Sequence, residues 1–110
     1  MIMEIDFITS NKGKIAALKR SFLNAGRFDI KVNQVQADIV EPQLNNIADV
    51  SKYKAMEAFK ILKKPILVED GGLVIEALNG FPGPYTKYVL STIGIDGILK
   101  LMNGENNRAA

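Results

Sequence analysis

Two adjacent carboxylates, Glu69 and Asp70, stand at the end of a short apolar stretch and are followed by Gly71 and Gly72. The stretch Ile66–Val68 has the continuous apolar pattern of a buried strand. Neighbouring side chains on a strand point to opposite faces, so only one of the two acids faces a given site. The glycines allow a sharp turn and a close approach by a ligand. The pattern indicates a metal-binding or acid–base carboxylate, and the competing interpretation is a strand that ends in an Asp-Gly turn.

A second group with chemical potential follows the predicted first strand, residues 2–8. It is Thr9-Ser10-Asn11-Lys12-Gly13-Lys14, and its capping-type residues predict the start of a helix. An apolar stripe at helical spacing then runs from Ile15 to Ala25, and Gly26 predicts the stop. Free amides at a helix start, with lysines beside them, favour an anion. The spacing of a Walker A loop is absent, and the alternative is a capped helix with solvated lysines.

Two further charged residues lie between these groups. Residues 30–37 alternate in polarity and predict a second strand nearer an edge of the sheet, and Glu41 lies in the polar loop that follows. Residues 47–63 predict a helix, and Lys54 falls inside its apolar arc. Lys54 either extends its ammonium to water or points at an anionic ligand at the edge of the core, and the sequence leaves both interpretations open.

The last third of the chain predicts a strand over 73–78 and a loop of fixed shape over 79–85. Pro84 then suits the first turn of a helix that Gly94 breaks, and Asp96 caps a short final helix over 98–102, ended by Gly104. Strands that alternate with helices indicate an α/β fold, with a mixed, partly parallel sheet flanked by helices. A length of 110 residues predicts one domain over 1–110.

The composition narrows the chemistry. The chain has neither Cys nor His, which excludes thiol nucleophiles, imidazole bases and thiolate zinc sites within it. Oxygen ligands remain, and they favour Mg²⁺ or Mn²⁺. A net charge of +2 is too balanced to predict a nucleic-acid partner, and no apolar run reaches the length of a membrane span. The first residues lack the basic region of a signal peptide, so we expect a cytoplasmic protein without a membrane partner.

Three motifs in this order and spacing resemble those of the Ham1-like inosine triphosphate pyrophosphatases, in particular the archaeal members. They are the Thr9–Lys14 turn, Val68-Glu69-Asp70-Gly71-Gly72-Leu73, and the run from Ala77 through Asn79-Gly80-Phe81-Pro82-Gly83-Pro84 to Tyr85. The resemblance covers nearly the whole chain. It implies an enzyme that hydrolyses ITP, dITP and XTP to the monophosphate and pyrophosphate with Mg²⁺.

The resemblance also implies roles for individual residues. The turn Thr9, Ser10, Asn11, Lys12, Gly13 and Lys14 would bind the triphosphate, with Lys54 reaching the phosphates. Asp70 would bind metal and activate water, and Glu41 and Glu69 would complete the metal ligands. Tyr88 falls where an aromatic side chain borders the nucleotide, and Gly71 falls beside the substrate.

The sequence departs from the family pattern in two respects. Gly71 replaces the usual Ser or Thr, which removes a hydroxyl near the substrate. The family is also nearly twice as long, and its second half contains the motifs that read the purine, so we expect the chain to resemble the phosphate-and-metal half. This leaves an alternative: a catalytically deficient nucleotide-binding or scaffold module. Apolar faces that a second lobe would cover predict a homodimer.

Overall fold

A computed structural model describes residues 1–110, and the chain divides into two compact units. We call residues 1–42 and 51–69 the N-terminal unit, and residues 43–50 and 70–110 the C-terminal unit. One boundary falls inside the helix over residues 47–62, and another falls between Glu69 and Asp70.

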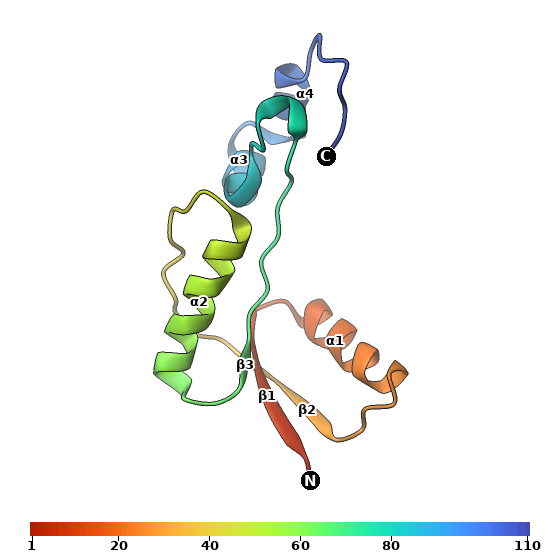
Figure 1. The fold of residues 1–110 in the computed structure, drawn as a ribbon, viewed down its shortest axis with the longest axis vertical. Coiled ribbons are helices and arrows are strands. Elements are labelled where there is room, and N and C mark those ends of the chain that lie inside the picture. Colours follow the sequence, from red (N-terminus) through yellow and green to blue (C-terminus); the bar gives the residue numbers. More distant parts are fainter. The chain divides into compact units, whose positions relative to one another are not determined.

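The N-terminal unit contains a three-stranded sheet with the order β2-β1-β3 (Figure 1). Its strands are β1 (Met3–Ile8), β2 (Ile30–Val35) and β3 (Ile66–Leu67). Both pairings of β1 are parallel, so the ladder has no antiparallel strand, whereas the sequence predicted a mixed sheet. The predicted edge position of β2 is confirmed, as is the α/β character of the chain. The carboxyl ends of parallel strands lie at one edge of a sheet, and here the Thr9–Lys14 turn and Glu69 follow two strands at that edge.

Helix α1 (Lys12–Asn24) begins directly after β1 and supplies one layer of the core. Phe7, Ile15 and Val32 are buried together, and partly buried side chains of α1, β2 and β3 pack against them. Gly26 has a φ of +73°, so it ends the helix in the left-handed conformation that glycine adopts without strain. The predicted helix and its stop are therefore confirmed.

Asp6 is a buried acid in the sheet, only 5% exposed. It faces Asn33 across the β1–β2 register, and the Asn33 amide donates a hydrogen bond of 3.1 Å to Asp6 Oδ1. That bond offsets part of the cost of removing a carboxylate from water. Helix α2 (Ile47–Leu62) matches the predicted helix, and its residues from Ser51 onward belong to the N-terminal unit, where Ala58 is fully buried.

Strand β3 is shorter and less buried than its apolar run suggested. Only Ile66 and Leu67 pair with β1, and both are half-buried. The prediction of a fully buried strand through Val68 is therefore wrong. Since β3 lies at an edge of this sheet, only one neighbouring strand covers its backbone groups.

The C-terminal unit is built from short helical elements around a separate core. They are η1 (Glu76–Leu78) and η2 (Gly83–Tyr85), both 3₁₀ helices, followed by α3 (Thr86–Thr92) and α4 (Gly94–Leu101). Ile75, Val89, Ile98 and Met102 form its buried cluster. None of the helices in the chain has both the length and the apolar content needed to cross a lipid bilayer.

Two expectations for this unit are wrong. The predicted strand over 73–78 contains only an isolated bridge between Val74 and Pro82, and it then turns into η1, which ends at Asn79 in the left-handed conformation. Asp96 does not cap the last helix, because α4 begins at Gly94 and places Asp96 in its first turn. Apolar residues spaced for a strand serve equally as one side of a short 3₁₀ turn, which explains the first error.

Candidate functional site

Two of the predicted site segments meet at the carboxyl edge of the sheet in the N-terminal unit. The Thr9–Lys14 turn follows β1, and Glu69 follows β3, the parallel neighbour of β1 (Figure 1). There the Lys14 ammonium donates a hydrogen bond of 2.8 Å to Glu69 Oε1. Parallel pairing thus joins a predicted phosphate ligand to a predicted metal ligand that lies 55 positions further along the chain.

Asn11 occupies part of the helix start that was predicted to offer free amides. Its side-chain oxygen accepts hydrogen bonds from the amides of Gly13, at 2.8 Å, and Lys14, at 3.2 Å. The Asn11 amide itself donates to the Thr9 hydroxyl. Asn is among the strongest N-caps, so the helix satisfies its own donors. The helix is capped, as the alternative interpretation held, and in the turn the amides of Ser10 and Lys12 remain without an acceptor in the N-terminal unit, so the anion site stays a prediction.

The other predicted site residues of this unit are accessible but form no ion pairs. Lys12 and Ser10 are exposed in the turn, and Glu41 is exposed in the loop between β2 and α2. Lys54 is half-buried on α2, as its place inside the apolar arc suggested. Within the N-terminal unit, Lys12, Lys54 and Glu41 form no ion pair, so Lys14 is the predicted phosphate-binding lysine that has a carboxylate partner in this unit.

Asp70, Gly71 and Tyr88 belong to the C-terminal unit. Asp70 is half-buried, and its Oδ1 accepts a 3.1 Å hydrogen bond from the Gly71 amide, which leaves the second carboxylate oxygen without a partner in the chain. Gly71 is exposed, and a Cβ placed on it would have no neighbour within 4 Å. Tyr88 lies on α3 with 71% of its surface exposed, so its ring is available to a ligand.

A hydrogen-bonded clamp holds the backbone just after Asp70. The Leu73 amide donates to the Thr86 hydroxyl at 2.8 Å, and that hydroxyl donates to the Gly83 carbonyl at 2.7 Å. The Gly83 amide closes the ring by donating to the Leu73 carbonyl at 2.8 Å. Sequence reasoning missed Thr86. The available signal was a hydroxyl residue directly after a loop whose two prolines and two glycines demanded a fixed shape.

The predicted metal ligands are divided between the two units, with Glu41 and Glu69 in the N-terminal unit and Asp70 in the C-terminal unit. The predicted ligands Glu41, Glu69 and Asp70 offer oxygens only, which suits Mg²⁺ or Mn²⁺. Neither unit by itself brings three or more acidic side chains together around a point that would hold a metal ion. The metal ligand set therefore remains a prediction.

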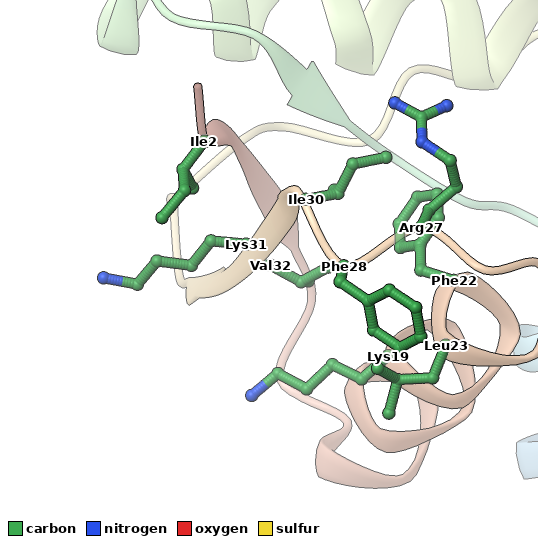
Figure 2. Close-up of a pocket in the computed structure, with 9 residues that line it drawn as sticks. All are labelled: Ile2, Lys19, Phe22, Leu23, Arg27, Phe28, Ile30, Lys31 and Val32. Carbon is green, nitrogen blue, oxygen red and sulfur yellow. The ribbon is translucent and has the colours of Figure 1, made fainter.

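The N-terminal unit also contains a groove that lies away from this edge. A groove of about 460 Å³ lies between the end of α1 and the start of β2, and Figure 2 shows its lining side chains: Ile2, Lys19, Phe22, Leu23, Arg27, Phe28, Ile30, Lys31 and Val32. These residues sit at the amino ends of the strands, opposite the Thr9–Lys14 turn. Arg27 is not free there. It forms two hydrogen bonds to Asp29, of 2.9 and 3.0 Å, which lower the pKa of that carboxyl.

The sequence is similar to that of known nucleotide pyrophosphatases. Residues 5–110 match the sequence profile of the Ham1 family. The chain is 45% identical to the dITP/XTP pyrophosphatase of Methanopyrus kandleri over 98% of its own length and 56% of the relative's. It is 44% identical to the dITP/XTP pyrophosphatase of Hyperthermus butylicus over 93% of its own length and 52% of the relative's. The chain thus spans about half the length of the curated relatives it matches.

Solved structures support the fold. The crystal structure of a nucleoside-triphosphatase / dITP/XTP pyrophosphatase from Mycobacterium abscessus matches with a TM-score of 0.78, at 22% identity, over 94% of this chain and 56% of that chain. The Staphylococcus aureus Ham1 protein matches with a TM-score of 0.77, at 25% identity, over 96% of this chain and 57% of that chain. The α/β fold predicted from the sequence is therefore confirmed.

Proposed function

Because the chain belongs to the Ham1 family, we propose that it hydrolyses noncanonical purine nucleoside triphosphates (ITP, dITP and XTP) to the monophosphate and pyrophosphate. The observation that carries the proposal is the juxtaposition of the Thr9–Lys14 turn and Glu69 at one sheet edge, in a chain whose relatives are named dITP/XTP pyrophosphatases. We further propose a cytoplasmic protein with no nucleic-acid or membrane partner, as the composition suggested.

The proposed reaction adds water across the anhydride bond between the α and β phosphates. The water oxygen forms a bond to the α phosphorus. The bond between that phosphorus and the oxygen that bridges the α and β phosphates breaks, and pyrophosphate leaves. In this scheme Asp70 acts as the general base. Its Oδ1 accepts a hydrogen bond from the Gly71 amide, and its other carboxylate oxygen accepts the proton of the water. Lys12, Lys14 and Lys54 hold the phosphates as point charges.

Glu41, Glu69 and Asp70 would hold Mg²⁺, or Mn²⁺ in its place. The bound cation would supply positive charge that neutralises a polyphosphate, in addition to the charge of the lysines. The chain's own contribution is orientation, because the Thr9–Lys14 turn and the end of β3 are positioned by regular parallel pairing.

The experiment that tests the proposal is a measurement of pyrophosphate release from ITP, dITP and XTP with Mg²⁺. We expect release that depends on the divalent cation and stops on chelation. The alternative is a catalytically deficient nucleotide-binding or scaffold module. Cation-dependent nucleotide binding without pyrophosphate release would establish the alternative.

Lys54 offers a separate test of the phosphate site. Lys54→Ala should weaken triphosphate binding by roughly tenfold and monophosphate binding much less, because a triphosphate presents more charge to the ammonium. Titration calorimetry with ITP and IMP measures both. Lys52→Ala is the matched control, since Lys52 is exposed on the same helix outside the apolar arc. Equal losses for both ligands would show that Lys54 is a solvated or structural residue.

We also propose that the protein is a homodimer. The groove of Figure 2 exposes large apolar side chains, among them Phe28 at 76%, Ile2 at 69% and Leu23 at 54%, and such patches favour association. Sedimentation across a dilution series should show a dimer that Phe28→Asp dissociates. Val40→Asp is the control, because Val40 is equally exposed, at 77%, but lies outside the groove. A wild-type protein that stays monomeric at high concentration would contradict the dimer.

A further inference from the structure

The ion pair between Lys14 and Glu69 joins a residue expected to bind a phosphate anion to a residue expected to bind a metal cation. Its 2.8 Å length is that of a strong charge-assisted hydrogen bond, and it lies entirely within the N-terminal unit. The two side chains are 45% and 40% exposed, so an incoming anion or cation has access to both. Lys14 comes from the first turn of α1 and Glu69 from the end of β3, so neither is tied to the other by local sequence.

The pairing of Lys14 with Glu69 weakens the binding of a polyphosphate at Lys14. A lysine ammonium has three donors, so Lys14 has donors left for a phosphate oxygen while it still bonds Glu69. The carboxylate would then lie beside that phosphate, and two anions so close repel each other. Lys12 and Lys54 have no such partner within the N-terminal unit, so in this unit the effect is specific to Lys14.

We propose that Glu69 couples the binding of a divalent cation to the binding of a polyphosphate through Lys14. Without the cation, Glu69 neutralises Lys14 and repels the polyphosphate. Once Glu69 has taken a divalent cation, its charge is compensated and the Lys14 ammonium is released to bind phosphate oxygens. Coupling of this kind is reciprocal, so a polyphosphate held by Lys14 also strengthens cation binding at Glu69. The inference rests on the proposed function, because it uses the phosphate and metal roles assigned there.

The test measures binding of inorganic tripolyphosphate by calorimetry, first with a chelator and then with excess Mg²⁺. In the chelator, Glu69→Gln should bind tripolyphosphate about fivefold more tightly than the wild type, because the exposed pair and the nearby negative charge are both removed. The ratio of the affinities with and without Mg²⁺ should fall by a similar factor. In the Lys14→Ala background, Glu69→Gln should give a clearly smaller gain, since only the direct repulsion between Glu69 and the polyphosphate is left to relieve.

Glu57→Gln is the matched control. Glu57 forms an exposed ion pair with Lys60 on α2, of 2.9 Å, outside the predicted site, so its loss should leave tripolyphosphate binding unchanged. A circular dichroism melt of each variant checks that it is folded.

The outcomes separate the inference from the function it rests on. If Lys14→Ala weakens tripolyphosphate binding but Glu69→Gln leaves the affinity in chelator unchanged, the coupling is refuted and the proposed phosphate site stands. A gain from Glu69→Gln that persists at full size in the Lys14→Ala background also refutes it, since general repulsion would then suffice. If tripolyphosphate fails to bind with Mg²⁺, or if Lys14→Ala has no effect on binding, the proposed phosphate site itself fails.

Discussion

Asp70→Asn should reduce pyrophosphate release from ITP by at least about a hundredfold, while the melting temperature changes by no more than about 2 °C. The substitution keeps the size of the side chain but removes the negative charge. The amide cannot take a proton from water, and it is a weaker ligand for a hard cation. The expected loss is large because general-base and metal functions would disappear together.

The structure indicates that this substitution spares stability. Asp70 is half-buried, and its only bond within the chain is the one that its Oδ1 accepts from the neighbouring Gly71 amide. The Asn side-chain oxygen can accept the same bond. If Asp70→Asn unfolds, the prediction that it preserves stability is wrong, and its loss of activity would not be evidence for a catalytic role of Asp70.

Asp96→Asn is the matched control for Asp70. Asp96 is an exposed acid in the same unit, in the first turn of α4, and no site role is expected for it. Its replacement should leave pyrophosphate release within about twofold of wild type and cost at most about 1 kcal/mol through the helix dipole. If Asp70→Asn retains activity within tenfold of wild type, Asp70 is a turn residue, as the competing interpretation of the sequence held.

Gly72→Ala should lower the free energy of unfolding by about 2 kcal/mol or more. A Cβ at this position would overlap the Gly83 carbonyl oxygen, and it would approach Ile47 Cδ1 and Thr86 Oγ1 to 3.0 Å. The Gly83 carbonyl accepts a hydrogen bond from the Thr86 hydroxyl, so moving it away from the new Cβ would break that bond. Thermal unfolding followed by circular dichroism measures the effect, with an expected fall of roughly 8 °C or more.

Gly71→Ala separates this steric effect from a general cost of losing glycine. The adjacent Gly71 has open space where a Cβ would lie and no positive φ, so alanine should change the free energy of unfolding by less than about 1 kcal/mol, in either direction. Similar destabilisation by both substitutions would show that backbone freedom, rather than the approach of Gly83 to Gly72, explains the need for glycine.

Local patterns were sufficient for the regular elements of this protein. β1, α1, β2 and α2 follow from alternation, from an apolar stripe at helical spacing and from the Gly26 stop, because each depends on residues within one or two turns. The three motifs were also sufficient to indicate the family, because their residue types and spacing are a property of the chain alone. By contrast, the apolar run over 73–78 fits a strand or a 3₁₀ turn equally well, and only its packing around Ile75 selects the turn.

The tertiary structure alone decided which charges meet. Lys14 and Glu69 are brought together because β3 pairs with β1 in parallel, and the sequence shows no local sign of that register. The same is true of the clamp that joins Leu73 to Thr86 and Gly83. A sequence specifies short-range preferences through backbone and side-chain sterics, whereas contacts between distant segments depend on how whole elements pack. The sequence by itself therefore determined the candidate residues, and only the fold decided which of them are neighbours.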